Sequence, residues 1–170
     1  MNTAELLADA YGRIQEAVHE AVDDLSAEEL SWRPDEGGNS VAWLVWHLTR
    51  VQDDHVADVA GREQLWTADG WRDRFGLPFR PSVIGYGQSA AQAAKVRVDD
   101  PALLTGYYDA VHEATLGYVA GLADGDLDVI VDERWDPPVT LGVRLLSVVN
   151  DDLQHAGQAA YVRGLLLRRR

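Results

Sequence analysis

The sequence of 170 residues contains no cysteine. This absence excludes disulfides, thiolate-bound metals, iron–sulfur clusters and a cysteine nucleophile. Any metal site must therefore take its ligands from histidine, aspartate, glutamate, backbone carbonyl groups or water.

Positive charge is also scarce. The chain has 15 Lys and Arg residues against 28 Asp and Glu residues, which gives a net charge of −13, and Lys95 is the sole lysine. Because phosphate groups are bound mainly by Lys and Arg, we expect neither a nucleic-acid partner nor attachment to an anionic membrane. We interpret the basic run Arg168–Arg170 as a solvated C-terminal tail.

Long apolar runs and several enzyme motifs are missing as well. No apolar run is long enough to span a bilayer, and the N-terminal residues lack the pattern of a signal peptide, so we expect a cytoplasmic protein. There is no His-Glu-x-x-His, no Gly-x-Ser-x-Gly and no phosphate-binding glycine loop between a strand and a helix. The enzyme classes that carry these motifs are therefore not indicated.

What is present is the composition of a globular protein, with 46% hydrophobic and 25% charged residues. The length suits one domain that covers residues 1–170. Apolar residues recur at helical spacing in four long segments, and good N-cap residues precede the later three. The expected helices cover residues 3–24, 40–61, 101–122 and 141–167.

The connections between these segments differ in length and content. Residues 25–30 predict a short helical turn, with Ser26 and Glu29 in capping-box spacing. Residues 62–99 form a long connection whose many aromatic residues suggest packing against the core, with a short helix near Trp71. Residues 123–139 predict a loop with a short extended segment at 129–131. Four long helices with one long crossover between the second and the third indicate an all-α four-helix bundle.

Two histidines and an aspartate have the placement of metal ligands. His47 lies on the apolar stripe of the second long helix, with Trp43 one turn before it. Asp151 and His155 are four residues apart in the last helix, so they share one face. A carboxylate and an imidazole on adjacent turns can reach one ion, and a histidine from a facing helix would complete three protein ligands. Three ligands leave a coordination position open, as in catalytic sites.

Each of these residues also has a simpler explanation. A lone histidine on an apolar face is more often a core residue, and an Asp–His pair one turn apart can be a plain ion pair. Asp152 is three residues from His155, a spacing also found in helical-bundle metal sites, and periodicity does not choose between it and Asp151. Asp54 lies on the same face as His47 and is a candidate to orient it or to join the site.

Other polar residues complete the set of candidates. Gln158 follows His155 by one turn and is a candidate to hydrogen-bond a ligand or to bind a cofactor. Arg144 lies on the same broad face, where it would meet an anionic substrate group or pair with an aspartate. We expect His19 to be solvated among acidic residues and His112 to form a surface pair with the glutamate that follows it.

Two stretches resemble the DinB-like superfamily. Asn39–Leu48, preceded by Trp32–Pro34, is similar to the second-helix motif of that group. His155–Gln158, followed by Tyr161–Leu165, is similar to its last-helix motif. The likeness extends to the order and lengths of the helices over most of the chain. It is greatest to the actinobacterial branch near the mycothiol-dependent maleylpyruvate isomerases.

The resemblance implies a DinB-like four-helix bundle that holds one divalent metal through three side chains. The second-helix histidine of the family matches His47, and the last-helix pair matches Asp151 and His155. The first residue of that pair is histidine in many members and glutamate in the isomerases, so the shorter Asp151 is a departure that bears on metal affinity. The resemblance also favours Asp151 over Asp152.

Family members with assigned chemistry use the metal to activate a low-molecular-weight thiol. The resemblance therefore implies a metal-dependent S-transferase or isomerase that binds zinc or nickel, a thiol such as mycothiol and a small electrophile. The alternatives are a metal-dependent hydrolase with Asp54 or Asp152 as the base, and a non-catalytic bundle that binds a small ligand. A homodimer is a further expectation, because many such bundles pair through helix faces.

Overall fold

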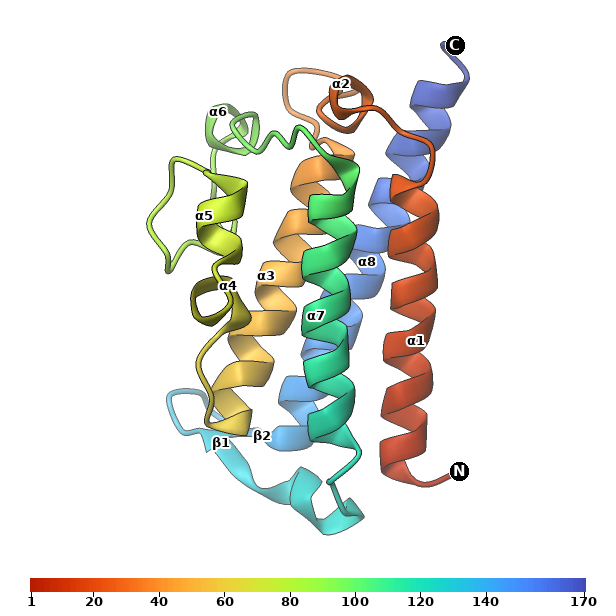
Figure 1. The fold of residues 1–170 in the computed structure, drawn as a ribbon. Coiled ribbons are helices and arrows are strands. Elements are labelled where there is room, and N and C mark those ends of the chain that lie inside the picture. Colours follow the sequence, from red (N-terminus) through yellow and green to blue (C-terminus); the bar gives the residue numbers. More distant parts are fainter.

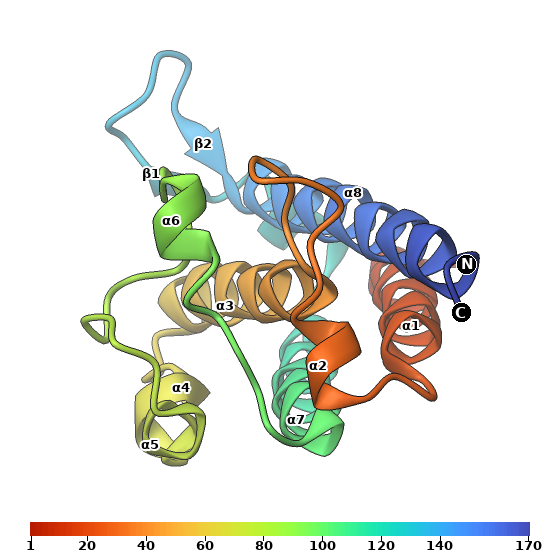
Figure 2. The same cartoon turned by 90° about the horizontal axis from the view of Figure 1, so that it is seen from above.

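Four long helices form the body of the molecule in the computed structural model, which describes residues 1–170. They are α1 (Thr3–Val22), α3 (Val41–Ala60), α7 (Pro101–Val119) and α8 (Leu141–Leu167). Helices α3 and α1 each pack against both α7 and α8, so that the four surround a common core (Figures 1 and 2). This arrangement confirms the expected all-α four-helix bundle.

The residues at the helix ends explain where three of these helices begin and one of them stops. Helices α3, α7 and α8 are capped at their starts by Ser40, Asp100 and Thr140, respectively. The side chain of each cap accepts a hydrogen bond from a backbone N–H group of the first turn. Gly61 ends α3 in the left-handed conformation, with a φ of 63°. Such residues satisfy backbone groups that a helix end leaves unpaired, and the predicted starts are thereby confirmed.

Two helices are shorter than the apolar periodicity predicts. Helix α1 ends at Val22 rather than at Asp24, because Asp24 adopts a positive φ of 55° and turns the chain toward the next segment. Helix α7 ends at Val119 rather than near Leu122, where the chain turns. Apolar residues beyond a helix end still contact the core, so periodicity alone overestimates the length of the helix.

Short helices occupy the connections. Helix α2 (Ala27–Leu30) carries the predicted capping box of Ser26 and Glu29. The connection between α3 and α7 holds α4 (Leu65–Ala68), α5 (Trp71–Phe75) and α6 (Ala90–Ala93), where one short helix was expected. Its aromatic rings pack on α7, with the Trp66 and Trp71 ring centroids 5.3 and 5.5 Å from that of Tyr107. The long connection is therefore part of the packed structure (Figure 1).

A small hairpin precedes the last helix. After the 3-10 helix η1 (Asp124–Asp128), strand β1 (Ile130–Asp132) pairs antiparallel with β2 (Val139–Thr140). The extended segment expected at 129–131 corresponds to β1. The hairpin lies beside the start of α8, at the end of the bundle where α3 finishes (Figure 1).

Helix α3 is the most enclosed element. Every residue from Val41 to Asp53 is buried, because α7, α8 and the long connection cover different sides of this helix. The polar side chains in this stretch, among them His47, Arg50 and Asp53, therefore need partners within the protein. No helix of the chain combines the length and the apolar character that crossing a membrane requires.

Candidate metal centre

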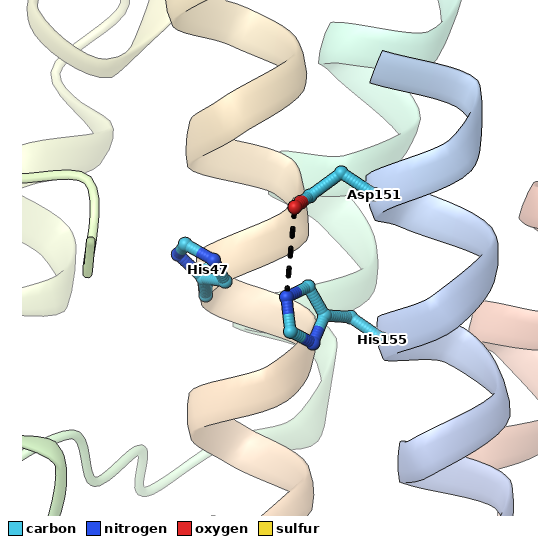
Figure 3. Close-up of side chains that lie close together, drawn as sticks. All are labelled: His47, Asp151 and His155. Carbon is cyan, nitrogen blue, oxygen red and sulfur yellow. Dashed lines mark ion pairs between the residues drawn. The ribbon is translucent and has the colours of Figure 1, made fainter. Parts of the chain in front are cut away.

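His47 of α3 and the pair Asp151 and His155 of α8 point toward one another between these helices (Figure 3). One ligand atom from each, an imidazole nitrogen or a carboxylate oxygen, lies within 4.8 Å of the other two. His155 Nε2 is 3.7 Å from Asp151 Oδ1, and the two imidazole centroids are 4.8 Å apart. The three residues that the sequence suggested as metal ligands are thus brought together.

Each imidazole is oriented by a hydrogen bond at Nδ1, the ring nitrogen that faces away from the centre. His47 Nδ1 donates to the backbone carbonyl of Ile84. A carbonyl can only accept, so the proton of a neutral His47 lies on Nδ1 and the lone pair on Nε2. His155 Nδ1 is 2.9 Å from Oε1 of Gln158, which accepts in the same way. Such hydrogen bonds typically accompany histidines that bind a metal through the other nitrogen.

The surroundings of His47 restrict its ring further. Gly85 has a φ of 100°, and a Cβ atom placed there would lie 2.5 Å from His47 Nδ1. Glycine at this position is therefore required for the connection to approach the imidazole. Trp43 stacks on the ring with centroids 4.6 Å apart, and its Nε1 donates to Gln88 Oε1 at 2.8 Å.

Burial and charge at this centre suit a cation. His47 is 4% exposed, and burial lowers its pKa below the usual value, although the Ile84 carbonyl opposes this effect. A lowered pKa keeps the imidazole neutral, as metal binding requires. Asp151 Oδ2 is buried and has no hydrogen-bond partner. Two imidazoles and a carboxylate with a free buried oxygen are a donor set that fits a divalent metal such as zinc.

The two other aspartates considered from the sequence lie elsewhere. Asp152 points into the core, is fully buried, and has no partner for either oxygen. Burial and the neighbouring Asp151 raise its pKa well above the usual range, which favours the uncharged, protonated acid. Asp54 accepts a hydrogen bond from Gln64 Nε2 at 2.7 Å and does not orient His47.

Arg144, the second residue suggested for cofactor binding, does not lie at the three-residue centre. One of its terminal nitrogens is 2.9 Å from His55 Nδ1 and the other is 3.1 Å from Asp132 Oδ2. The structure therefore gives Arg144 the aspartate partner that the sequence analysis offered as its simpler role. It also lines a cavity beside the C-terminal half of α3.

The expectation for His112 was wrong. This residue is 6% exposed and its ring stacks on Tyr108, with centroids 5.9 Å apart. The spacing of four residues from Tyr108 places it on the buried face of α7, which outweighs the polarity of the glutamate that follows. His19 is partly exposed, as expected, but its partner is Asp109 of α7 at 2.8 Å rather than an acid of its own helix.

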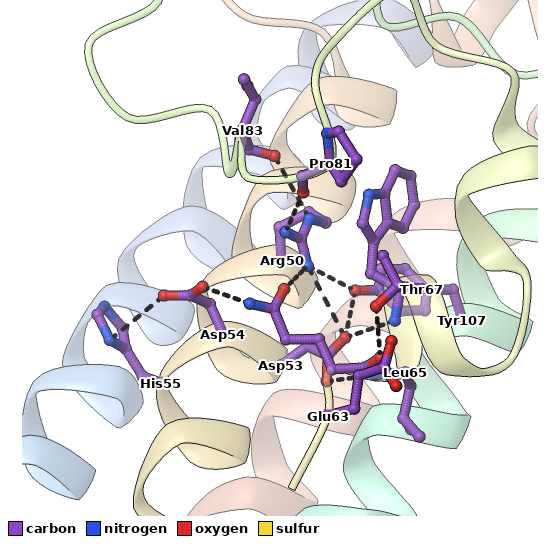
Figure 4. Close-up of polar contacts among 12 residues, drawn as sticks. Arg50, Asp53, Asp54, His55, Glu63, Leu65, Thr67, Pro81, Val83 and Tyr107 are labelled. Carbon is purple, nitrogen blue, oxygen red and sulfur yellow. Dashed lines mark hydrogen bonds and ion pairs between the residues drawn. The ribbon is translucent and has the colours of Figure 1, made fainter.

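Sequence reasoning did not identify the role of Arg50. This side chain is fully buried and donates to the backbone carbonyls of Pro81 and Val83, at 3.1 and 3.4 Å (Figure 4). It also donates to Gln64 Oε1 at 2.8 Å and lies 3.8 Å from the carboxylate of Asp53. An arginine in the middle of an apolar helix face was the available signal, because such a charge is buried only with several partners.

Comparison with known proteins agrees with this fold. A profile of the DinB superfamily matches residues 10–159. A crystal structure described as the conserved protein of locus from Enterococcus faecalis is similar over 98% of both chains, with 30% sequence identity and a TM-score of 0.92. A search of curated proteins found no match. On the extent of the profile match, the chain belongs to the DinB superfamily.

Proposed function

We propose that this chain is a metal-dependent enzyme that activates a low-molecular-weight thiol for S-transfer to, or isomerisation of, a small electrophile. Mycothiol is the thiol that the family resemblance suggests. One observation carries the proposal: the ligand atoms of His47, Asp151 and His155 converge, and both imidazoles have their far nitrogen held by an acceptor.

Each side chain has a definite part in this proposal. His47 and His155 offer their Nε2 atoms, and Asp151 adds one negative charge that would offset part of the charge of a dication. A divalent metal such as zinc or nickel, held by these three residues, would lower the pKa of a thiol and so supply a thiolate nucleophile at neutral pH. The protein contains no cysteine, so the sulfur must come from a cofactor.

The experiment is metal analysis followed by a conjugation assay. Protein purified without chelators is loaded with zinc or nickel and given mycothiol or another thiol together with a set of electrophiles. We expect thiol-dependent product formation that is lost in His155→Ala and retained in His19→Gln, a histidine outside the centre. Absence of bound metal and of conjugation would overturn the proposal, and turnover without any thiol would favour a hydrolase in its place.

A further inference from the structure

A polar cavity of about 520 Å³ lies beside the C-terminal half of α3, where this helix faces the start of α8. Ala57 and Pro81 are its only non-polar lining residues. The cavity has the size of a small-molecule site, but it lacks the largely apolar lining that such sites usually have. A ligand that fits it must therefore be recognised by charge and hydrogen bonding.

The cavity is close enough to the candidate metal centre for one ligand to reach both. His55 lies about two turns beyond His47 on α3, and Arg144 about two turns before Asp151 on α8. At 5.4 Å per turn, both lining residues are about 11 Å along the helices from the centre. Burial and Arg144 lower the pKa of His55, whereas the carboxylates of Asp54 and Asp151 raise it. The negative charge of Asp151 at the centre therefore acts on a residue that lines the cavity.

Guanidinium groups outnumber their carboxylate partners at two places on the wall. Asp132 binds Arg134 at 2.8 Å and Arg144 at 3.1 Å, so one carboxylate serves two cations. Asp53 likewise lies close to two guanidinium groups, 3.8 Å from that of Arg50 and 3.5 Å from that of Arg62. Arg62 also has a buried terminal nitrogen with no hydrogen-bond partner. Each place therefore has one positive charge in excess.

Three carboxylates line the same cavity, from Asp54, Asp58 and Glu63. Asp54 accepts a hydrogen bond from Gln64, and its ion-pair contact is with His55, whose Nδ1 lies 3.8 Å from Asp54 Oδ2 (Figure 4). The lowered pKa of His55 leaves that neighbour without charge at neutral pH. The lining arginines make their ion pairs with other carboxylates, so none of these three acids has an ion-pair partner among them, and Asp58 acts on Arg134 only over a longer distance.

We propose that this cavity binds a zwitterionic head group, an ammonium with a carboxylate, at the far end of the thiol whose sulfur lies at the candidate metal centre. An anion alone would face three carboxylates, and a cation alone would face the excess guanidinium charges. A group with both signs is complementary to the whole lining. The inference rests on the proposed function, because that function supplies the sulfur-bearing ligand. It favours a thiol with a zwitterionic end over mycothiol, which carries a neutral sugar there.

The test compares three thioethers by isothermal titration calorimetry on the full chain. The probe γ-glutamyl-S-methylcysteine carries both charges, glutaryl-S-methylcysteine lacks the ammonium, and 4-aminobutyryl-S-methylcysteine lacks the carboxylate. We expect the first to bind about tenfold more tightly than either of the others, since each lost charged hydrogen bond is worth about that factor.

Three results would overturn the proposal: equal affinities for the three thioethers, no binding of the first probe, or tighter binding of methyl 1-thioglucoside. The last result would indicate a neutral polyhydroxyl group, such as the sugar part of mycothiol.

Two exposed variants separate the two charges. Asp58→Asn is expected to weaken the preference for the ammonium, and Arg134→Gln the preference for the carboxylate. The Arg134 side chain is 84% exposed and Asp58 is also exposed, so neither change threatens folding. The control Asp128→Asn removes an exposed acid outside the cavity and is expected to keep the wild-type order of affinities. Unchanged preferences in both variants would overturn the proposal.

A second measurement keeps the two proposals apart. Cobalt-loaded protein is titrated with the free thiol γ-glutamylcysteine while the thiolate-to-cobalt absorption band is recorded. No band, together with the expected order among the thioethers, would overturn the thiol function and retain the zwitterion cavity. A band, together with equal affinities for the three thioethers, would retain the thiol function and overturn the cavity.

Discussion

The two imidazoles of the candidate metal centre depend on acceptors of different kinds. His155 uses Gln158, which lies three residues further along the same helix, whereas His47 uses the carbonyl of Ile84, which lies far away in the sequence. The first acceptor is carried along with its histidine by the helix. The second is in place only when the long connection packs against α3, so His47 is the ligand whose orientation depends on tertiary structure.

We predict that Gly85→Ala lowers metal affinity about 10- to 100-fold, the usual cost of disturbing the partner of a metal-binding histidine. The added Cβ would lie 2.5 Å from His47 Nδ1 and must displace either the ring or the connection. Gly87→Ala is the matched control, because Gly87 also has a positive φ, of 70°, but has no atom within 4 Å of the added carbon. Both variants lose about 1–3 kcal/mol of stability through backbone strain. Equal metal affinity in the two variants, measured by competition with a chromophoric chelator, would contradict this role of Gly85.

A pH effect is expected from His112. Burial, together with His19, lowers the pKa of His112, against an opposing contribution from Asp109. The unfolded chain binds this proton near pH 6.5 and the folded chain only at lower pH. The stability contributed by neutral His112 is therefore complete above about pH 6.5 and is lost as the pH falls from there toward the folded-state pKa.

His112→Phe removes this titration and keeps an aromatic ring against Tyr108. Thermal unfolding at pH 8, 6.5 and 5 is expected to show that the melting temperature falls less on acidification in the variant than in the wild type. Parallel pH profiles of the two proteins would show that the proton of His112 does not contribute to stability.

At the scale of whole elements, periodicity located the four long helices, although not the ends of α1 and α7, but it did not describe the connection between α3 and α7. Caps such as Ser40 and Thr140 act within one turn, so the sequence displays them directly. Arg50 contacts residues more than thirty positions away, and no local pattern indicates such partners. The same difference explains why the spacing of Asp151 and His155 was informative, whereas the link between His47 and Ile84 was not predicted.

We predict that Arg50 fixes the connection that holds His47. Its guanidinium binds the carbonyls of Pro81 and Val83, directly before Ile84. Arg50→Lys keeps a charge for Asp53 but loses the forked geometry, so metal affinity is expected to fall about tenfold. Tyr107→Phe is the control, since its hydroxyl binds Arg50 and Asp53 but not the connection.

The measurements for this pair are zinc titration and thermal unfolding. The control is expected to lose about 1 kcal/mol of stability for its buried hydrogen bonds and to keep the wild-type metal affinity. Equal loss of metal affinity in Arg50→Lys and Tyr107→Phe would show that general destabilisation, rather than the position of the connection, is responsible.

At the scale of the whole molecule, the candidate metal centre depends on the arrangement of the bundle. Helices α3 and α8 run in opposite directions side by side, so His47 meets a pair that follows it by about a hundred residues in the sequence (Figure 1). The unfolded chain does not hold these three side chains together, and a metal that needs all three binds the folded state preferentially.

Zinc is therefore expected to stabilise the entire fold. At a free concentration about a hundred times the dissociation constant, binding adds about 2.7 kcal/mol to the free energy of unfolding. For a chain of this size that corresponds to a rise in melting temperature of about 5–10 °C. Scanning calorimetry with zinc and with a chelator measures the shift.

Two variants test whether the shift comes from this centre. His155→Ala should lose the zinc-induced rise, while His55→Gln, which changes a histidine outside the centre, should keep it. An equal rise in wild type and His155→Ala would mean that zinc binds elsewhere, because the shift would not depend on the convergence of α3 and α8.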